Sequence, residues 1–240
     1  MTGKEQALLA RIIDLFAAKF GKKAVLRGGM VLKILGSPRY TNDLDYVFIP
    51  FSSKKEIVSD ILESLTSIRG ATIRHELNSQ CLRIHLTVDG TATVQIEAKV
   101  AKEEKTDIAS SRLLSTQFNL PPRIIHIVDH SVSMANKMSA WNERRLIRDV
   151  YDTCFFLRMN IKPDIMILRN RLKEPRYAKT VKKADYFSGK AVAEFVEFMR
   201  EHVNSLTQKQ IEGELADYLI PDELVGLSLE FKATFASFSI

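Results

Sequence analysis

Strand-like alternation of apolar and polar residues fills part of the first half of the chain and is absent from the second half. The clearest run is 81–88, where every second residue is apolar, and segments 72–77 and 93–100 also read as strands. A period of two is typical of a strand that buries one face. The Asp89-Gly90 pair between the last two segments predicts a hairpin. These three segments therefore predict an antiparallel meander.

Helical periodicity surrounds this meander on both sides. Before it we expect helices at 5–20, 30–35 and 54–68, and strands at 23–27 and around Asp43, Asp45 and Val47. A charged stretch at 101–107 and Pro121-Pro122 indicate a connection, beyond which strand signals fade. The later helices are expected at 129–158 (one or two helices), 165–174, 190–206, 207–219 and 222–234.

The predicted fold class is therefore α+β, with two domains. Residues 1–122 would form a small mixed or antiparallel sheet with flanking helices, and residues 123–240 an all-helical bundle. A chain of 240 residues with 45% hydrophobic residues can build such cores without disulfide support. This composition excludes a disordered or fibrous protein.

The charge and the cysteines narrow the class of protein further. Lys and Arg number 35 against 29 Asp and Glu, and this excess of +6 suggests an anionic partner. Two cysteines, Cys81 and Cys154, exclude a disulfide framework and a zinc cluster built on cysteines, and their apolar surroundings predict buried thiols. We find no signal-peptide pattern and no membrane span, so a cytoplasmic protein without a membrane partner is expected.

Two adjacent glycines, Gly28 and Gly29, stand between the expected strand at 23–27 and the expected helix at 30–35. Glycines allow a close approach of the backbone to a ligand, and free N–H groups at a helix start favour phosphate. Lys33 and Arg39 lie beside this turn and could assist it. The alternative is a tight turn with no ligand.

Three carboxylates are candidates for metal binding. Asp43 and Asp45 lie two residues apart on an expected strand and therefore share a face, and Glu97 on a later strand could join them. Mg²⁺ takes oxygen ligands from one or two carboxylates and substrate phosphates. Together with the glycine pair, this set is typical of nucleotidyl transfer. The alternatives are a solvated strand edge for the two aspartates and an exposed strand residue for Glu97.

A second charged pattern lies near the expected helices at 129–158. At about 100° per residue, Lys137, Arg144, Arg148 and Asp152 fall within roughly an 80° arc of one helix, with Asp149 nearby. One interpretation is a solvated face with ion pairs such as Arg148 with Asp152. The other is a wall in which the bases contact phosphate oxygens, while the two aspartates hold the bases or assist proton transfer.

Both patterns resemble a known family. Gly28-Gly29-Met30-Val31-Leu32-Lys33, followed by Arg39-Tyr40-Thr41-Asn42-Asp43-Leu44-Asp45, resembles the abortive-infection Eii/Gii nucleotidyltransferase toxins of the DNA polymerase β-like superfamily. The later Lys137, Arg144 and Arg148-Asp149-Val150-Tyr151-Asp152 resemble that family's Lys, Arg and Arg-Asp-x-x-Asp signature. The resemblance spans residues 25 to about 155.

The resemblance implies an enzyme that moves a nucleoside monophosphate from a nucleoside triphosphate to an acceptor hydroxyl with Mg²⁺ or Mn²⁺. It implies metal ligands Asp43, Asp45 and Glu97, further catalytic residues Lys137, Asp149 and Asp152, and nucleotide-binding residues Gly28, Gly29, Lys33, Arg39, Lys137, Arg144 and Arg148. It also implies a toxin with an antitoxin partner and an RNA acceptor, tRNA-like in some relatives.

Two alternatives and one further segment remain open. The fold could serve as a non-catalytic module that binds nucleic acid or protein, or the acceptor could be a small molecule or a protein. The basic residues between Arg169 and Lys183, with Tyr177, Tyr186 and Phe187 among or beside them, could contact an RNA backbone and stack on bases. A solvated helix face is the other interpretation of that segment.

Overall fold

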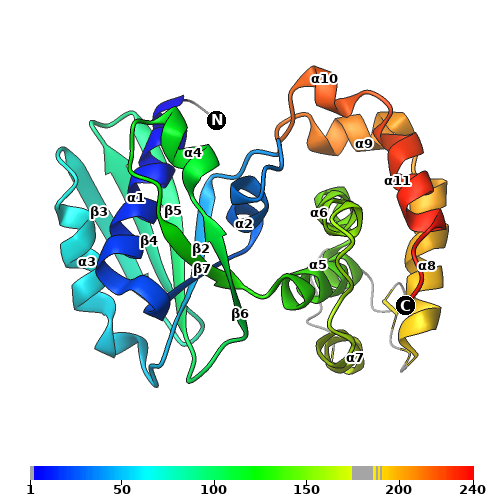
Figure 1. Cartoon of the computed structure of the whole chain (residues 1–240), viewed down its shortest axis with the longest axis horizontal. Coiled ribbons are helices and arrows are strands. Elements are labelled where there is room, and N and C mark those ends of the chain that lie inside the picture. Colours follow the sequence, from blue (N-terminus) through cyan, green and yellow to red (C-terminus); the bar gives the residue numbers. More distant parts are fainter. Residues whose placement is uncertain (1–2, 175–185, 188, 190) are drawn as a thin grey trace. The chain divides into compact units, whose positions relative to one another are not determined.

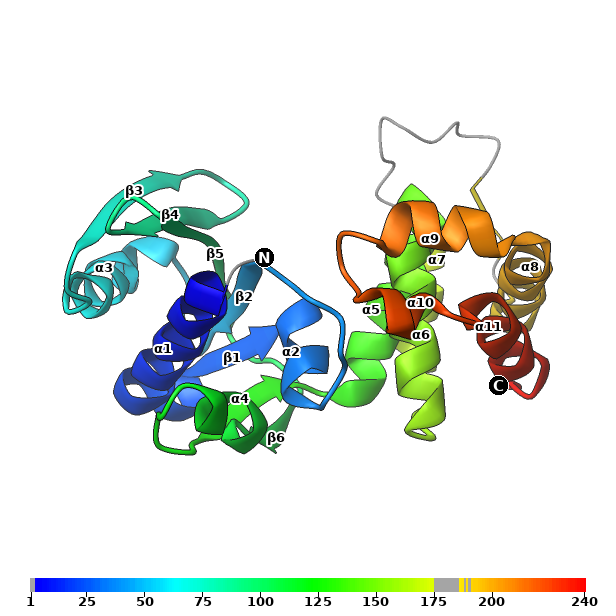
Figure 2. The same ribbon diagram turned by 90° about the horizontal axis from the view of Figure 1, so that it is seen from above.

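The structure is a computed structural model of the chain and describes residues 3–174, 186, 187, 189 and 191–240. Contacts divide the chain into two compact units, Met1–Asp129 and His130–Ile240. The colours of Figures 1 and 2 run from blue to green through the first unit and from green to red through the second. Each unit is described by itself below.

A mixed sheet of seven strands forms the centre of the first unit, in the order β3-β4-β5-β2-β1-β7-β6. The β2–β5 and β1–β7 pairs are parallel and the other neighbours are antiparallel. The strands are β1 (Ala24–Arg27), β2 (Asp43–Phe48), β3 (Ala71–Leu77), β4 (Leu82–Val88), β5 (Ala92–Val100), β6 (Thr106–Ser110) and β7 (Ile124–Val128). The expected meander is thus confirmed as β3-β4-β5.

Alternation along β4 and β5 gives this part of the sheet one apolar and one polar face. On the central strands β1 and β2, Val25 and Val47 are buried as well, on the face that carries Asp45. Leu44, Ile84 and Ile96 are fully buried and belong to the same core as Ile12 and Phe16 of the first helix. Figure 2 shows that helix beside α3, next to the sheet. The helical segments are α1 (Gly3–Phe20), η1 (Gly21–Lys23), α2 (Gly29–Ile34), η2 (Lys54–Glu56), α3 (Val58–Thr66) and α4 (Arg112–Gln117). Apolar burial here leaves polar side chains, including the candidate carboxylates, on the opposite face.

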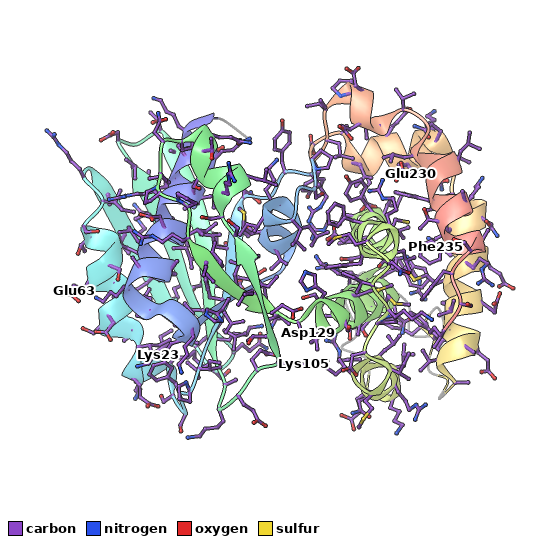
Figure 3. The ribbon with its side chains drawn as sticks, in the orientation of Figure 1. Lys23, Glu63, Lys105, Asp129, Glu230 and Phe235 are labelled. Atoms are coloured by element: carbon purple, nitrogen blue, oxygen red, sulfur yellow. The ribbon has the colours of Figure 1, made fainter. Side chains whose placement is uncertain are left out.

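The region after residue 100 contains two strands, where the sequence indicated only a connection. β7 follows Pro121-Pro122 and pairs with both β1 and β6. Two contacts between Asp129 and Lys105 follow the last residue pair of β6 and β7 (Figure 3). The backbone N–H of Asp129 donates to the Lys105 carbonyl at 2.9 Å, and the Asp129 carboxylate lies 3.4 Å from the Lys105 ammonium. The sheet therefore continues beyond the boundary expected at residue 122.

The described residues of the second unit form helices joined by turns and loops, and no strand. Its helices are α5 (His130–Arg144), α6 (Ile147–Arg158), α7 (Ile165–Lys173), α8 (Val192–Ser205), α9 (Gln208–Leu215), α10 (Pro221–Leu224) and α11 (Leu227–Ala236). Its core is rich in aromatic side chains, with Trp141, Phe156, Phe195 and Phe235 all fully buried (Phe235 is labelled in Figure 3). None of the described helices combines the length and apolar character that a membrane-spanning helix needs.

Both cysteines are buried free thiols, as their apolar surroundings predicted. Burial raises the pKa of the Cys154 thiol well above its ordinary value. A buried thiol with a raised pKa holds little thiolate, so Cys154 is a packing residue of α6 rather than a nucleophile.

Candidate active site

The turn between β1 and α2 brings the backbone against the carboxylate of Asp45. Gly28 has φ +76°, and a Cβ added there would lie 2.3 Å from Asp45 Oδ2. The next glycine, Gly29, is similarly close to Arg39, because its Cβ would lie 2.6 Å from Arg39 Nη2. A side chain at Gly28 would have to displace the Asp45 carboxylate and would also strain the backbone, because its φ is positive. A side chain at Gly29 would only require the end of the Arg39 side chain to move.

Register places the three candidate carboxylates in neighbouring positions on the polar face. Asp45 is the parallel partner of Glu97, and Asp43 is the partner of Gln95 two residues earlier. Residues paired across parallel strands lie about 4.8 Å apart on the same face. Asp43 is exposed, and Asp45 and Glu97 are half-buried. The expected common face of the three acids is therefore present in the sheet.

One oxygen of Glu97 is held by neighbours on the same face. Arg83 of β4, the antiparallel partner of Glu97, donates from Nε at 3.1 Å and from Nη2 at 2.8 Å to Glu97 Oε1. Gln95 Nε2 contacts the same oxygen at 3.4 Å. The hydrogen bond to Glu97, and the negative charge of Glu97, raise the pKa of Arg83. All three contacts use Oε1, so they fix the carboxylate without engaging Oε2.

The donor chemistry of this row suits a hard divalent cation. Among the described residues, no group of three or more His, Cys, Asp and Glu side chains is arranged to hold a metal ion by itself. Mg²⁺, however, is usually held by one or two carboxylates, substrate phosphates and water. Asp43 and Asp45 supply the two carboxylates, and the missing side chain of Gly28 leaves room beside Asp45 Oδ2. These residues fit such an ion as part of a metal–nucleotide complex.

The two basic residues expected at the glycine turn lie in different surroundings. Arg39 is buried, with its guanidinium against Gly29 and its Nη1 donating to the Tyr40 carbonyl at 3.3 Å. Lys33 Nζ lies 5.2 Å from the centre of the Tyr40 ring, and Lys33 lines a hollow of about 230 Å³ that Leu113 of α4 also lines. Partial burial lowers the pKa of Lys33. Of these two basic residues, Arg39 is therefore the one that lies against the glycine turn.

In the second unit, the charged residues do not lie on one helix. Lys137 and Arg144 belong to α5, whereas Arg148 and Asp152 belong to α6. Arg145 separates the helices with φ 55°, and its guanidinium Nη1 donates to the Trp141 and Asn142 carbonyls at 3.2 and 2.8 Å. The expectation of a single helical stripe was wrong, because Arg145 adopts a left-handed conformation and caps α5.

The break between the helices creates two ion pairs of bases with buried acids. Lys137 Nζ lies 2.6 Å from Asp152 Oδ2, and Arg144 donates from Nε and Nη2 to the two oxygens of Asp149, each at 2.7 Å. Both aspartate side chains are 0% exposed, whereas Arg144 is 36% exposed. Burial lowers the pKa of Arg144, but Asp149, Asp152 and Glu143 raise it overall. Both aspartates therefore hold a base in place.

Arg148 is held by a different neighbour from the one expected. Its Nη1 donates to the Tyr218 hydroxyl at 3.0 Å, and its guanidinium stands 5.7 Å from the centre of that ring. Its backbone N–H donates to Glu214 Oε1 at 3.1 Å. These contacts connect the first turn of α6 to α9 and the turn after it.

The basic segment has only part of its length within the described residues. Arg171 pairs with Glu143 at 2.6 Å, Tyr186 is buried with its hydroxyl donating to the Glu143 carbonyl, and Phe187 packs against Phe195. The suggested stacking role is wrong for Tyr186, because its ring is buried. The half-buried ring of Phe187 is in part used in packing, and its stacking role stays a prediction. Arg176, Tyr177, Lys179, Lys182 and Lys183 lie outside the described residues.

A family model covers almost the whole chain. Residues 8–232 match the family described as "Nucleotidyl transferase AbiEii toxin, Type IV TA system", where TA denotes toxin–antitoxin. The chain belongs to the AbiEii nucleotidyltransferase toxin family. As a member of this family, the chain is an enzyme, a nucleotidyltransferase toxin.

Solved structures share the AbiEii-type fold of this chain. The nucleotidyltransferase toxin MenT4 from Mycobacterium tuberculosis H37Rv matches with TM-score 0.61 and 12% identity, over 97% of this chain and 82% of MenT4. JHP933 from Helicobacter pylori matches with TM-score 0.55 and 13% identity, over 98% of this chain and 92% of that protein. No curated protein sequence matches the chain. At these identities the structural likeness supports the fold.

Sequence reasoning missed two residues beside the AbiEii carboxylates. Arg83 bonds to Glu97, and Arg27 is the β1 partner of Asp45. Arg27 directly precedes the glycine pair, so its place at the turn could have been read from the motif itself. Arg83 lies 14 positions before Glu97, and only the hairpin register brings the two together.

The close approach of Gly28 to Asp45 predicts the effect of a single added methyl group. Gly28→Ala would place Cβ against Asp45 Oδ2 and strain the backbone, so we expect it to displace the carboxylate and reduce transfer at least tenfold. Gly21→Ala is the matched control, because Gly21 also has positive φ but has nothing within 4 Å of the added Cβ. Transfer rates and melting temperatures of both variants test this. Equal losses of transfer in the two variants would contradict it.

Proposed function

We propose that this AbiEii enzyme transfers a nucleoside monophosphate from a nucleoside triphosphate to a hydroxyl of RNA, with Mg²⁺ or Mn²⁺. The observation that carries the proposal is the row formed by Gly28, Asp45 and Glu97. The turn comes so near to Asp45 that a Cβ added to Gly28 would lie 2.3 Å from Asp45 Oδ2. Strand pairing sets Glu97 beside Asp45.

Asp43 and Asp45 would hold the divalent cation, and Glu97 would add a ligand through Oε2. When bound, the cation neutralises charge on the phosphates and polarises the α-phosphoryl group. Arg39 would add positive charge beside the Gly28-Gly29 turn, where the triphosphate would lie. In the helical unit, we assign triphosphate contacts to Lys137 and Arg144. The remaining expected nucleotide contacts, those of Lys33 and Arg148, are part of the same proposal.

In the proposed reaction, the acceptor hydroxyl oxygen forms a bond to the α-phosphorus. The bond from that phosphorus to the oxygen bridging to the β-phosphate breaks, and pyrophosphate leaves with the bridging oxygen. We assign the removal of the hydroxyl proton to Glu97. The ion pairs of Asp149 with Arg144 and of Asp152 with Lys137 favour a positioning role for both aspartates. Their contribution is to keep the bases oriented before the substrate arrives.

The contacts of Arg83 with Glu97 predict a change in metal dependence. Removing an outer hydrogen-bond partner of a metal ligand typically costs 10–100-fold in affinity or activity. We therefore expect Arg83→Leu to raise the Mn²⁺ concentration for half-maximal transfer about tenfold. Arg83→Gln keeps a donor for Oε1 and should show a smaller increase. Unchanged or lower Mn²⁺ requirements in both variants would show that Arg83 does not position Glu97.

Membership of a type IV toxin–antitoxin family supports an antitoxin as a protein partner. We propose that such a partner neutralises the toxin in the cell. The acceptor proposal rests on the net charge of +6 and on the resemblance to family members that act on RNA. A small-molecule or protein acceptor is the competing outcome.

Triphosphates labelled at the α or the γ position test the proposal. Each of the four nucleotides is incubated with the protein, Mg²⁺ and total RNA. We expect α-label in nuclease-sensitive, protease-resistant material, and γ-label only in pyrophosphate. Transfer of the γ-label would indicate phosphoryl transfer instead, and α-label in protease-sensitive material would indicate a protein acceptor.

A further inference from the structure

The polar face of the sheet contains a hollow beyond the candidate carboxylates. Its volume is about 590 Å³, and strands β3, β4 and β5, which lie side by side in Figure 2, contribute its walls. The side chains that matter for the argument are Arg74 on β3, His85 and Thr87 on β4, and Thr93 on β5. All but the half-buried Thr87 are exposed.

Register connects this hollow with the row of Asp43. Asp43 pairs with Gln95, Gln95 pairs with His85, and His85 pairs with Arg74. Four neighbouring strands with a spacing of about 4.8 Å place Arg74 roughly 14 Å from Asp43 along one row of the same face. A polymer whose end lies at the carboxylates could therefore continue across His85 to Arg74.

The hydrogen-bonding groups of the hollow suit a sugar–phosphate backbone. Arg74 offers the guanidinium fork that matches phosphate oxygens, and His85 adds a ring donor. The hydroxyls of Thr87 and Thr93 lie 3.0 Å apart, so together they present donor and acceptor positions to a ribose hydroxyl or a phosphate. Glu76 is the single carboxylate among the described lining residues and matches the single arginine, Arg74, so hydrogen-bonding groups rather than net charge characterise the hollow.

The lining also argues against the two competing acceptors. Sites for small molecules are mainly apolar, whereas every described lining residue here except Gly90 has a polar or charged side chain. Protein interfaces have an apolar core enriched in aromatic residues, and the described lining contains no aromatic side chain other than histidine. The described lining offers no Phe, Tyr or Trp on which bases could stack, so we expect its contacts to be mainly to the backbone.

We propose that this hollow binds the sugar–phosphate backbone of a single-stranded RNA acceptor, next to the hydroxyl that receives the nucleotide. The inference rests on the proposed RNA acceptor and names the residues that hold it. Because phosphates and ribose are common to all sequences, the contacts made here position the strand and do not read its bases.

The experiment compares Arg74→Ala with the parent protein in steady-state nucleotide transfer. The acceptor is the RNA that takes up the α-label in the triphosphate experiment above. Loss of one charged hydrogen bond predicts a KM for RNA raised about tenfold, with kcat at saturating RNA and the KM for the triphosphate unchanged. The dependence of RNA affinity on salt should also weaken, by about 0.7 in the slope of log K against log salt, since one phosphate contact is lost. Fluorescence anisotropy with a short single-stranded RNA measures this slope directly.

Arg112→Ala is the matched control, because Arg112 is an exposed arginine of the same unit on α4, outside the lining of the hollow. It should leave the KM for RNA and the salt slope unchanged. Equal effects of the two substitutions, an unchanged KM in Arg74→Ala, or a raised KM for the triphosphate alone would overturn the inference. If the parent protein transfers nothing to RNA, the proposed function fails first. If it transfers to RNA and Arg74→Ala behaves like the parent, only this inference fails.

Discussion

Asp45→Asn is expected to reduce nucleotidyl transfer about a thousandfold. A metal ion that polarises a phosphoryl group contributes several kcal/mol to the transition state, and each 1.4 kcal/mol is about a tenfold change in rate. The amide that replaces the carboxylate removes a negative ligand directly beside Gly28. Asp43→Asn should show a loss of similar size. The measurement is incorporation of α-labelled triphosphate into RNA at saturating Mg²⁺.

Asp60→Asn is the control for this loss, since Asp60 is an exposed aspartate on α3. It should transfer at the rate of the parent protein. Asp43 and Asp45 lie outside the apolar core. Melting curves of the three variants distinguish a loss of transfer from a loss of folding. A rate for Asp45→Asn within tenfold of the parent would rule out this aspartate as a metal ligand.

Arg144→Leu is expected to destabilise the helical unit by about 3 kcal/mol. The substitution leaves Asp149, whose side chain is 0% exposed, without the guanidinium that donates to both of its oxygens. Breaking a buried pair by removing one partner costs about 3–5 kcal/mol, because a buried charge stays uncompensated. We expect the lower end of this range, since the Arg144 side chain is 36% exposed. Denaturant unfolding measures the change.

The matched control is Arg158→Leu, which removes the arginine of an ion pair with Glu230 whose side chains are 44% and 36% exposed. An exposed pair contributes about 0–1 kcal/mol, so its loss should hardly change the free energy of unfolding. The double variant Arg144→Leu with Asp149→Leu should regain most of the stability, because no unpaired charge remains. Equal stability of Arg144→Leu and Arg158→Leu would contradict this role of the Arg144–Asp149 pair.

The hairpin between β4 and β5 shows how far the sequence could predict the candidate site. Asp89-Gly90 favours a two-residue turn, but Val88 pairs with Ala92, so three residues form the connection, with φ 50° at Asp89 and 66° at Gly90. A one-residue slip would have set Arg83 opposite the core residue Ile96. Alternation of apolar residues already opposes that slip. Glu97 on the polar face was therefore predictable, and its bond to Arg83 required the turn geometry.

The second unit shows where periodicity alone was insufficient. The spacing of apolar residues predicted that this unit is helical. The prediction of one charged face across residues 137–152 required an unbroken helix, which the structure does not contain. No glycine or proline stands at the break between α5 and α6. Arg145 itself adopts the left-handed conformation there, and its guanidinium caps α5. The pairs Lys137–Asp152 and Arg144–Asp149 follow from that break. A local conformation of this kind depends on packing around Trp141, which the sequence pattern does not encode.

The sequence pattern did not predict strands β6 and β7, for a different reason. β6 is a five-residue edge strand in which Ile108 is exposed, and β7 begins with the exposed Ile124. Such short strands offer too few alternating positions to be separated from a connection that contains charged residues and prolines. The apolar run at 124–128 was the available signal, since Ile125 and Ile127 are buried in the core.

Mass spectrometry of the RNA before and after reaction tests the central claim most directly. If the chain adds a nucleoside monophosphate to RNA with its divalent cation, the product gains the mass of one or more nucleotide residues, each a nucleoside monophosphate less one water. One pyrophosphate should appear for each residue added, and chelation of the metal should abolish both. An RNA whose mass is unchanged with all four triphosphates, or that gains only phosphate, would contradict the proposed function.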